Sequence, residues 1–185
     1  YVTGAEPGML YNTVTGKLYD GEKGVQVIPC YLDFEYQEWA DFGTGSGRPE
    51  KIYPADSDIL SKTQKDAMGK DRLPNGNYIQ TSAQWFVIVS DEKGSETVMI
   101  SFYSSNLPVS RKWNAAQMSI SFDGKDGPYT PARFSHIWKI STIEKSGKGN
   151  TWYVYKYELV RKLDPVKEIN LYNRAKQFKA NCKAR

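Results

Sequence analysis

Alternation of side chains with a period of two residues is the feature that most constrains the fold of this chain. Along residues 25–39, Tyr31, Asp33, Glu35 and Gln37 share one parity, and Cys30, Leu32, Phe34, Tyr36 and Glu38 share the other. This pattern indicates a half-buried β-strand, because successive side chains of a strand point to opposite faces of its sheet. Residues 84–103 predict a hairpin, and residues 133–160 predict a second one with a long, basic, glycine-rich loop at 144–150.

The remaining segments complete a mainly β (α+β) prediction. Residues 1–20 are typical of strands and turns, and residues 40–75 predict an excursion of loops with a short helix. A short helix is expected over residues 110–118 with Ser110 as its N-cap, and a C-terminal helix over about 165–183. We therefore expect one β-rich domain spanning residues 1–185, built as an OB-like β-barrel with long loops and a C-terminal helix.

The composition is unusually aromatic. The chain holds 25 Phe, Trp and Tyr residues, against 31 Val, Ile and Leu residues. A chain this rich in aromatic and β-branched residues is not expected to be disordered. No run of about 20 apolar residues exists, so a membrane-spanning helix is not predicted.

Charge is divided unevenly along the chain. Residues 1–92 carry 8 basic and 14 acidic residues, a net charge of −6, whereas residues 93–185 carry 17 basic and 7 acidic residues, a net charge of +10. A basic half in a small aromatic-rich protein favours a polyanionic partner.

The cysteines indicate neither a metal site nor a disulfide framework. Cys30 and Cys182 lie far apart in the sequence and form no metal-ligand spacing. We expect no cofactor and no metal. The sequence shows no signal-peptide pattern, so a cytoplasmic location is expected.

Catalytic motifs are weak. The only histidine, His136, lies within a predicted strand, and the glycine-rich run at 43–48 lacks the Lys-Ser/Thr ending of a phosphate-binding loop. Asp33 and Glu35 would share one strand face, with Lys51 as the nearest basic residue, as ligands of two-metal nucleases often do. A metal-dependent nuclease is therefore kept as an alternative, although we expect the protein not to be an enzyme.

Aromatic and basic residues alternate in several segments. The segments are 31–39, 110–113, 133–139 and 152–157. Proteins that bind single-stranded nucleic acid combine a cationic groove with exposed rings on which bases stack. In the last segment, Tyr153, Tyr155 and Tyr157 are expected on one face and Trp152, Val154 and Lys156 on the other.

These segments supply the predicted nucleic-acid contacts. The phosphate-binding candidates are Arg111, Lys112, Arg133, Lys139, Lys145, Lys148 and Lys156. The stacking candidates are Trp113, Trp138, Trp152 and Tyr155, with Tyr36 and Trp39 as second choices because carboxylates flank them. The basic loop from Lys145 to Asn150 is expected to close over a bound strand.

Several stretches resemble a group of tailed-phage proteins encoded near replication genes. They are Pro7–Gly16, Val27–Cys30, Tyr36–Trp39, Ser110–Asn114 and Asn150–Tyr153. The class that this resemblance implies is the phage single-stranded-DNA-binding proteins with an OB-like barrel. Such proteins commonly end in an acidic tail, whereas this chain ends in the basic segment 179–185.

The predicted function is therefore that of a phage protein that coats and protects single-stranded DNA during replication or recombination. Single-stranded DNA and phage replication proteins are its expected partners, and the host cytoplasm its expected location. A non-catalytic phage structural or interaction module without affinity for oligonucleotides is the second alternative.

Overall fold

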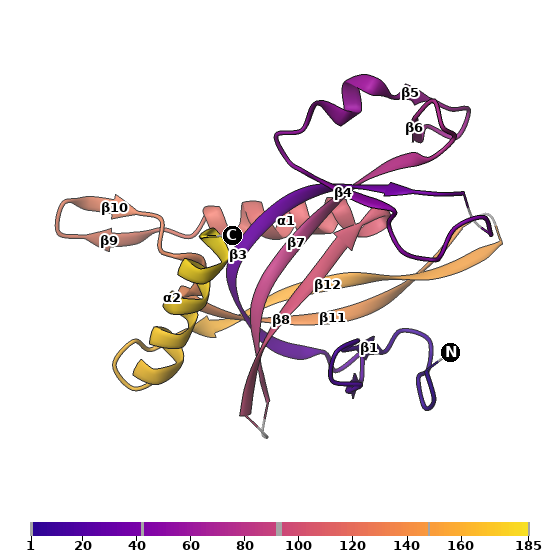
Figure 1. The fold of residues 1–185 in the computed structure, drawn as a ribbon. Helices are drawn as coiled ribbons and strands as arrows, with labels where there is room; N and C mark the ends of the chain where they lie inside the picture. Colours follow the sequence, from indigo (N-terminus) through magenta and orange to yellow (C-terminus); the bar gives the residue numbers. More distant parts are fainter. Residues whose placement is uncertain (1, 42, 92–93, 148, 185) are drawn as a thin grey trace.

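The largest feature of the fold is a strongly curled antiparallel sheet shaped like half a barrel (Figure 1). The computed structural model describes residues 2–41, 43–91, 94–147 and 149–184. Five long strands follow one another across the sheet: β8 (Gly94–Tyr103), β7 (Tyr78–Asp91), β3 (Val25–Trp39), β11 (His136–Gly147) and β12 (Asn150–Lys162). The mainly β class is confirmed. The outer strands β8 and β12 do not pair with each other over the described residues.

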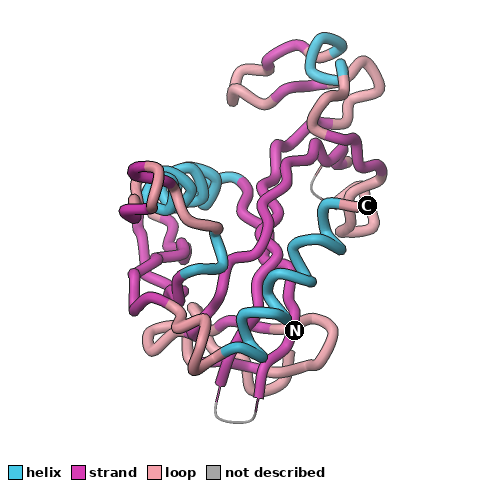
Figure 2. The backbone as a smooth tube through the Cα atoms, turned by 90° about the vertical axis from the view of Figure 1, so that its left-hand side faces the viewer, coloured by secondary structure: helices cyan, strands magenta, loops and turns pink. Residues whose placement is uncertain are grey.

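Two helices cover the two faces of this sheet (Figure 2). On one face, Trp113 of α1 (Leu107–Met118) packs among Trp85, Phe102 and Trp138, all buried. On the other face, α2 (Ile169–Lys183) places Ala175 in a second buried cluster. Val27 and Val87 belong to the first cluster, and Ile28 and Ile88 to the second. The central strands are therefore apolar on both faces where the helices cover them, and alternate between polar and apolar residues elsewhere.

A β-bulge in β3 places one residue on the opposite face from the one that alternation predicted. The register of β3 with β7 shifts between Pro29 and Tyr31, so Cys30 is the additional residue. Cys30 packs with Ile28 in the cluster under α2, not on the α1 side with Leu32. A bulge places two residues opposite one and so interrupts strict alternation.

Shorter strands and 3₁₀ turns make up the rest of the fold. They are β1 (Leu10–Tyr11), β2 (Leu18–Tyr19), β4 (Lys51–Pro54), the 3₁₀ turn η1 (Asp58–Lys62), β5 (Gln64–Lys65), β6 (Asp71–Arg72), η2 (Ser104–Asn106), β9 (Phe122–Gly124), β10 (Gly127–Tyr129) and η3 (Arg133–Ser135). The expected excursion at 40–75 contains β4 through β6, and its predicted helix is only the five-residue η1. None of the helices in the described part of the chain is long and apolar enough to span a membrane.

Three predicted boundaries differ from the structure. Helix α1 begins at Leu107 because Pro108 suits its first turn, so Ser110 lies inside the helix, where its Oγ accepts a 2.8 Å hydrogen bond from Trp85 Nε1. The predicted loop at 144–150 is mostly strand, since β11 extends to Gly147 and β12 begins at Asn150. Helix α2 begins at Ile169, four residues later than expected.

Candidate nucleic-acid interface

One face of the β11–β12 hairpin gathers four of the predicted contact residues. The strand register pairs Lys139 with Glu158, Ser141 with Lys156, Ile143 with Val154, and Lys145 with Trp152. Since alternate residues of a strand share a face, these four pairs form one ladder, which we call the lysine face. Tyr155 and Tyr157 point the other way, into the core cluster around Trp113. The predicted division of the 152–157 segment between two faces is therefore confirmed.

Trp152 is the exposed ring of the lysine face. Its side chain retains 39% of its surface, whereas Trp85, Trp113 and Trp138 retain 3% or less. A Cβ atom built on Gly147 would lie 3.3 Å from the Trp152 ring, so the glycine lets the indole approach the neighbouring strand. One side of the ring is thereby supported, and Lys145 lies directly across from it in the ladder.

The other end of the lysine face carries two lysines that share a carboxylate. Glu158 Oε2 lies 2.5 Å from Lys139 Nζ, and its Oε1 lies 3.0 Å from Lys156 Nζ. Hydrogen bonds from these two ammonium groups lower the pKa of Glu158. Lys139, Lys145 and Lys156 together still exceed Glu158 by two positive charges. Glu158 holds both ammonium groups over the same strand surface.

Asn106 fixes the free edge of the hairpin. Its Oδ1 accepts a 2.7 Å hydrogen bond from the backbone N–H of Tyr155, which is a donor that no neighbouring strand uses. Asn106 ends η2, which directly follows β8. The contact therefore ties the end of β8, through η2, to the outer strand β12.

The structure buries two of the four rings first chosen for stacking and half-buries a third. Trp113 and Trp138 are core residues, and Tyr155 packs against Phe102 with ring centroids 4.7 Å apart. Burial also raises the pKa of Tyr155. Trp113 and Trp138 have no free face for a base, because the helical stripe of α1 and the alternating pattern of β11 point them inward.

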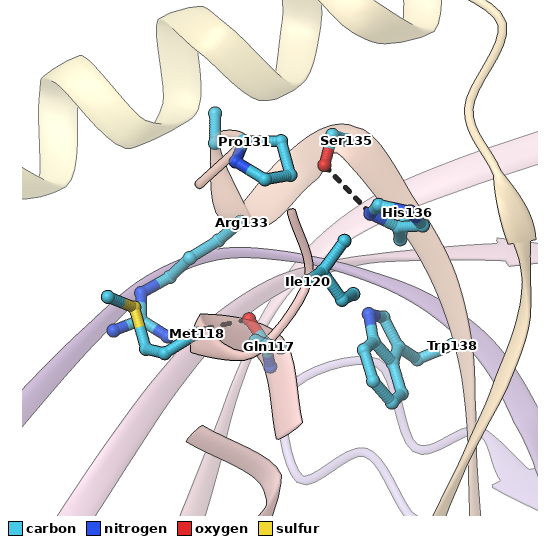
Figure 3. Close-up of a pocket in the computed structure, with 9 residues that line it drawn as sticks. Gln117, Met118, Ile120, Pro131, Arg133, Ser135, His136 and Trp138 are labelled. Carbon is cyan, nitrogen blue, oxygen red and sulfur yellow. Dashed lines mark hydrogen bonds between the residues drawn. The ribbon is translucent and has the colours of Figure 1, made fainter. Parts of the chain in front are cut away.

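The remaining predicted residues lie away from the lysine face. Arg111 and Lys112 are exposed on α1, and Arg133 is half-buried at η3. Tyr36 and Trp39 are half-buried at the far end of β3, on opposite faces of that strand. Lys148 lies outside the described residues. Gln117 of α1 was not predicted, although it lines a small cavity beside Arg133 (Figure 3). An isolated helical glutamine carries no sequence signal for such a position.

The acidic strand of the nuclease alternative is engaged in a hydrogen-bond network. Glu35 Oε1 accepts amide hydrogen bonds of 2.7 Å from both Gln37 and Gln84. Gln84 in turn accepts a 2.6 Å hydrogen bond from Ser101. Across the described residues, no three histidine, cysteine or carboxylate side chains are grouped as metal ligands. Glu35 therefore acts in the structure as an acceptor between strands.

Comparison with known families identifies the origin of the chain. The family model of the Pam3 phage gp34-like proteins matches residues 1–185. The chain belongs to the Pam3 phage gp34-like family. No match is found among the curated proteins or among the solved structures.

Membership of the Pam3 phage gp34-like family makes this a bacteriophage protein. The phage part of the resemblance seen in the sequence is thus confirmed. The family name identifies no ligand, and the lysine face is the feature of the fold that gathers exposed cations and an exposed ring.

Proposed function

We propose that this phage protein binds single-stranded DNA through the lysine face of the β11–β12 hairpin. The observation that carries the proposal is the placement of Lys139, Lys145 and Lys156 on one strand face with the half-exposed ring of Trp152. From Lys139 to Lys145 the face extends about 20 Å, given about 3.3 Å per residue along a strand. Such a length suits a backbone that lies along the hairpin.

The chemistry of the face favours a single strand over a duplex. A base stacked on an exposed indole contributes about 1–3 kcal/mol, and stacking requires a base whose face is free. The lysines offer flexible point charges to phosphates without reading base edges. Binding without sequence preference follows, as expected of a protein that coats and protects DNA during phage replication or recombination. The curled sheet supports this proposal, because OB folds, which bind oligonucleotides, are also built on a curled sheet of five strands.

A fluorescence titration with oligo-dT tests the proposal. The triple variant Lys139→Gln, Lys145→Gln and Lys156→Gln removes the cations of the lysine face. The matched control removes three exposed lysines elsewhere in the second half: Lys125→Gln, Lys167→Gln and Lys176→Gln. Because each phosphate contact on a single strand contributes about 0.7 to the slope of log affinity against log salt, the lysine-face variant should lose about 2 units of slope. The control should lose much less.

Two results would overturn the proposal. One is the absence of tryptophan quenching by oligo-dT at low salt, which would favour an interaction module instead. The other is equal loss of affinity in the two triple variants, because diffuse charge would then explain binding. Duplex DNA of the same length serves as the competing ligand, and it should bind more weakly than oligo-dT.

A further inference from the structure

A small cavity separates the C-terminal end of α1 from η3 and the start of β11 (Figure 3). Gln117, Met118 and Ile120 line it from the helix side, and the segment 131–138 lines it from the other. Its volume is about 10 Å³. That is room for a single water-sized atom, such as one oxygen of a larger group that stays outside.

Two buried N–H donors among the lining residues have no partner. Trp138 Nε1 and Gln117 Nε2 are both buried and make no hydrogen bond in the structure. Their residues are 3% and 5% exposed. A buried donor left unpaired destabilises the folded state, so such groups normally have an acceptor, a water or a ligand. Both groups here lack an acceptor.

A positive charge without a carboxylate partner lies beside these donors. The Arg133 guanidinium lies over the Trp85 ring, 5.4 Å from its centroid, and donates one long hydrogen bond of 3.4 Å to Gln117 Oε1. Burial lowers the pKa of Arg133. Within the described residues, Arg133 has no salt bridge, whereas Arg72 and Arg161 each have one or more. Most of its five donors remain available to an acceptor from outside.

The other polar groups of the cavity add no negative charge. Ser135 Oγ and His136 Nδ1 form a hydrogen bond of 2.8 Å, so these two atoms are already partnered with each other. Burial, together with nearby Lys162, lowers the pKa of His136, which favours the neutral ring. The cavity thus combines one cation and two free N–H groups, which is the donor set that an anionic oxygen requires.

We propose that Arg133, Gln117 and Trp138 form a subsite for one phosphate oxygen of the bound DNA strand. The identity of the phosphate rests on the proposed function, whereas the preference for an anionic oxygen rests on the cavity itself. Arg111 lies seven residues before the cavity-lining Met118, on the same side of α1 and about 10 Å away along the axis. A strand that reaches the cavity can therefore also place a phosphate at Arg111.

The indole N–H resonance of Trp138 reports directly on this subsite. In a ¹H–¹⁵N spectrum each of the five tryptophans gives an indole signal, and the Trp138→Phe and Trp152→Phe variants assign the two that matter. In the unmodified protein, added oligo-dT should shift both indole signals until binding is saturated. In Arg133→Gln the Trp138 shift should disappear while the Trp152 shift persists, and affinity should fall about tenfold.

Matched variants separate the subsite from general charge and from misfolding. Arg48→Gln removes the same charge from an exposed arginine and should change affinity less than about twofold. Arg133→Lys keeps the charge but loses the planar set of guanidinium donors, so this variant should bind oligo-dT with intermediate affinity. Gln117→Met keeps the volume, removes the free amide, and should weaken the Trp138 response without altering the other indole signals.

The outcomes distinguish the subsite from the proposed function. If the Trp152 signal moves and the Trp138 signal does not, DNA binds but the subsite proposal is overturned. If neither signal moves, the proposed function fails and the DNA subsite fails with it. If inorganic phosphate shifts the Trp138 signal and oligo-dT does not, the cavity takes free phosphate, which also overturns the proposal.

Discussion

At the scale of single residues, neighbouring cations do not reveal which tryptophans are exposed. Trp113 follows Arg111 and Lys112 directly, yet it is fully buried. Its position is three residues after Ser110 and four before Gln117, and all three share the inward side of α1. Trp152 has no cation next to it in the sequence, yet it is exposed, because it belongs to a strand face that no helix covers. The deciding factor is the face of the element, not the local composition.

This difference predicts opposite effects for two substitutions. Trp113→Ala removes a ring from the main core cluster and should reduce the free energy of unfolding by about 3–5 kcal/mol. Trp152→Ala should leave stability nearly unchanged and weaken oligo-dT binding about tenfold, because one stacking platform is lost. Urea denaturation and a binding titration on both variants measure the two effects. A strongly destabilised Trp152→Ala would contradict the assignment of that ring to the surface.

Sequence alternation predicted part of this arrangement. It placed Tyr155 and Tyr157 opposite Trp152 and Lys156, which the structure confirms, but it did not say that the tyrosine face is the one that packs against the α1 core. That choice depends on α1, which packs there through contacts remote in sequence. Likewise, Cys30 departs from its expected face because a bulge depends on pairing with β7.

At the scale of elements, the hairpin shows why composition misplaces loop boundaries. Ser, Lys and Gly residues at 144–150 are typical of a loop, but the backbone keeps pairing up to Gly147 and Asn150. Glu144 accepts a 3.0 Å hydrogen bond from Tyr153 across the strands. Polar side chains on a solvent-facing strand are compatible with the ladder, since its hydrogen bonds use only the backbone.

Helix α2 starts beside an ion pair that should make stability depend on pH. Glu168 accepts two 2.7 Å hydrogen bonds from Arg161 and one of 2.9 Å from the backbone N–H of Asp164. These bonds lower the pKa of Glu168 from 4.5 to about 2. A lowered carboxyl pKa means that the stabilisation is present above pH 4.5 and is lost as pH falls from there through about 2.

Glu168→Gln should therefore lower the Tm at pH 7 and lower it much less at pH 2. The pair is partly exposed, so its contribution is about 1 kcal/mol, which corresponds to about 2–4 °C in Tm. Thermal unfolding of the variant and the unmodified protein from pH 7 to pH 2 measures the difference. Asp126→Asn, an exposed carboxylate in the turn between β9 and β10, is the control. A Tm difference that stays constant over this pH range would contradict the role of the pair.

At the scale of the whole molecule, the division of charge along the sequence does not become a division in space. Strands β3 and β7 from the acidic half lie between β8 and β11 from the basic half. Acidic residues are instead grouped behind the hairpin, where Glu6, Asp20, Glu22 and Glu144 line an open groove of about 540 Å³ together with Tyr153. Tyr153 belongs to the face opposite Trp152, so most of this groove lies on the other side of the hairpin from the lysine face, and Ile143 of the lysine face lines its edge.

That arrangement predicts that the groove repels DNA from the Tyr153 end of the hairpin. Removing two of its charges, with Glu6→Gln and Glu22→Gln, should raise oligo-dT affinity a few-fold at 0.01 M salt, where the screening length is about 30 Å. The gain should disappear near 1 M salt, where that length falls to about 3 Å. The control is Asp123→Asn with Asp126→Asn in the β9–β10 hairpin, at the other end of the molecule in Figure 1. Equal gains in both double variants would mean that net charge alone acts, and would contradict the role of the groove.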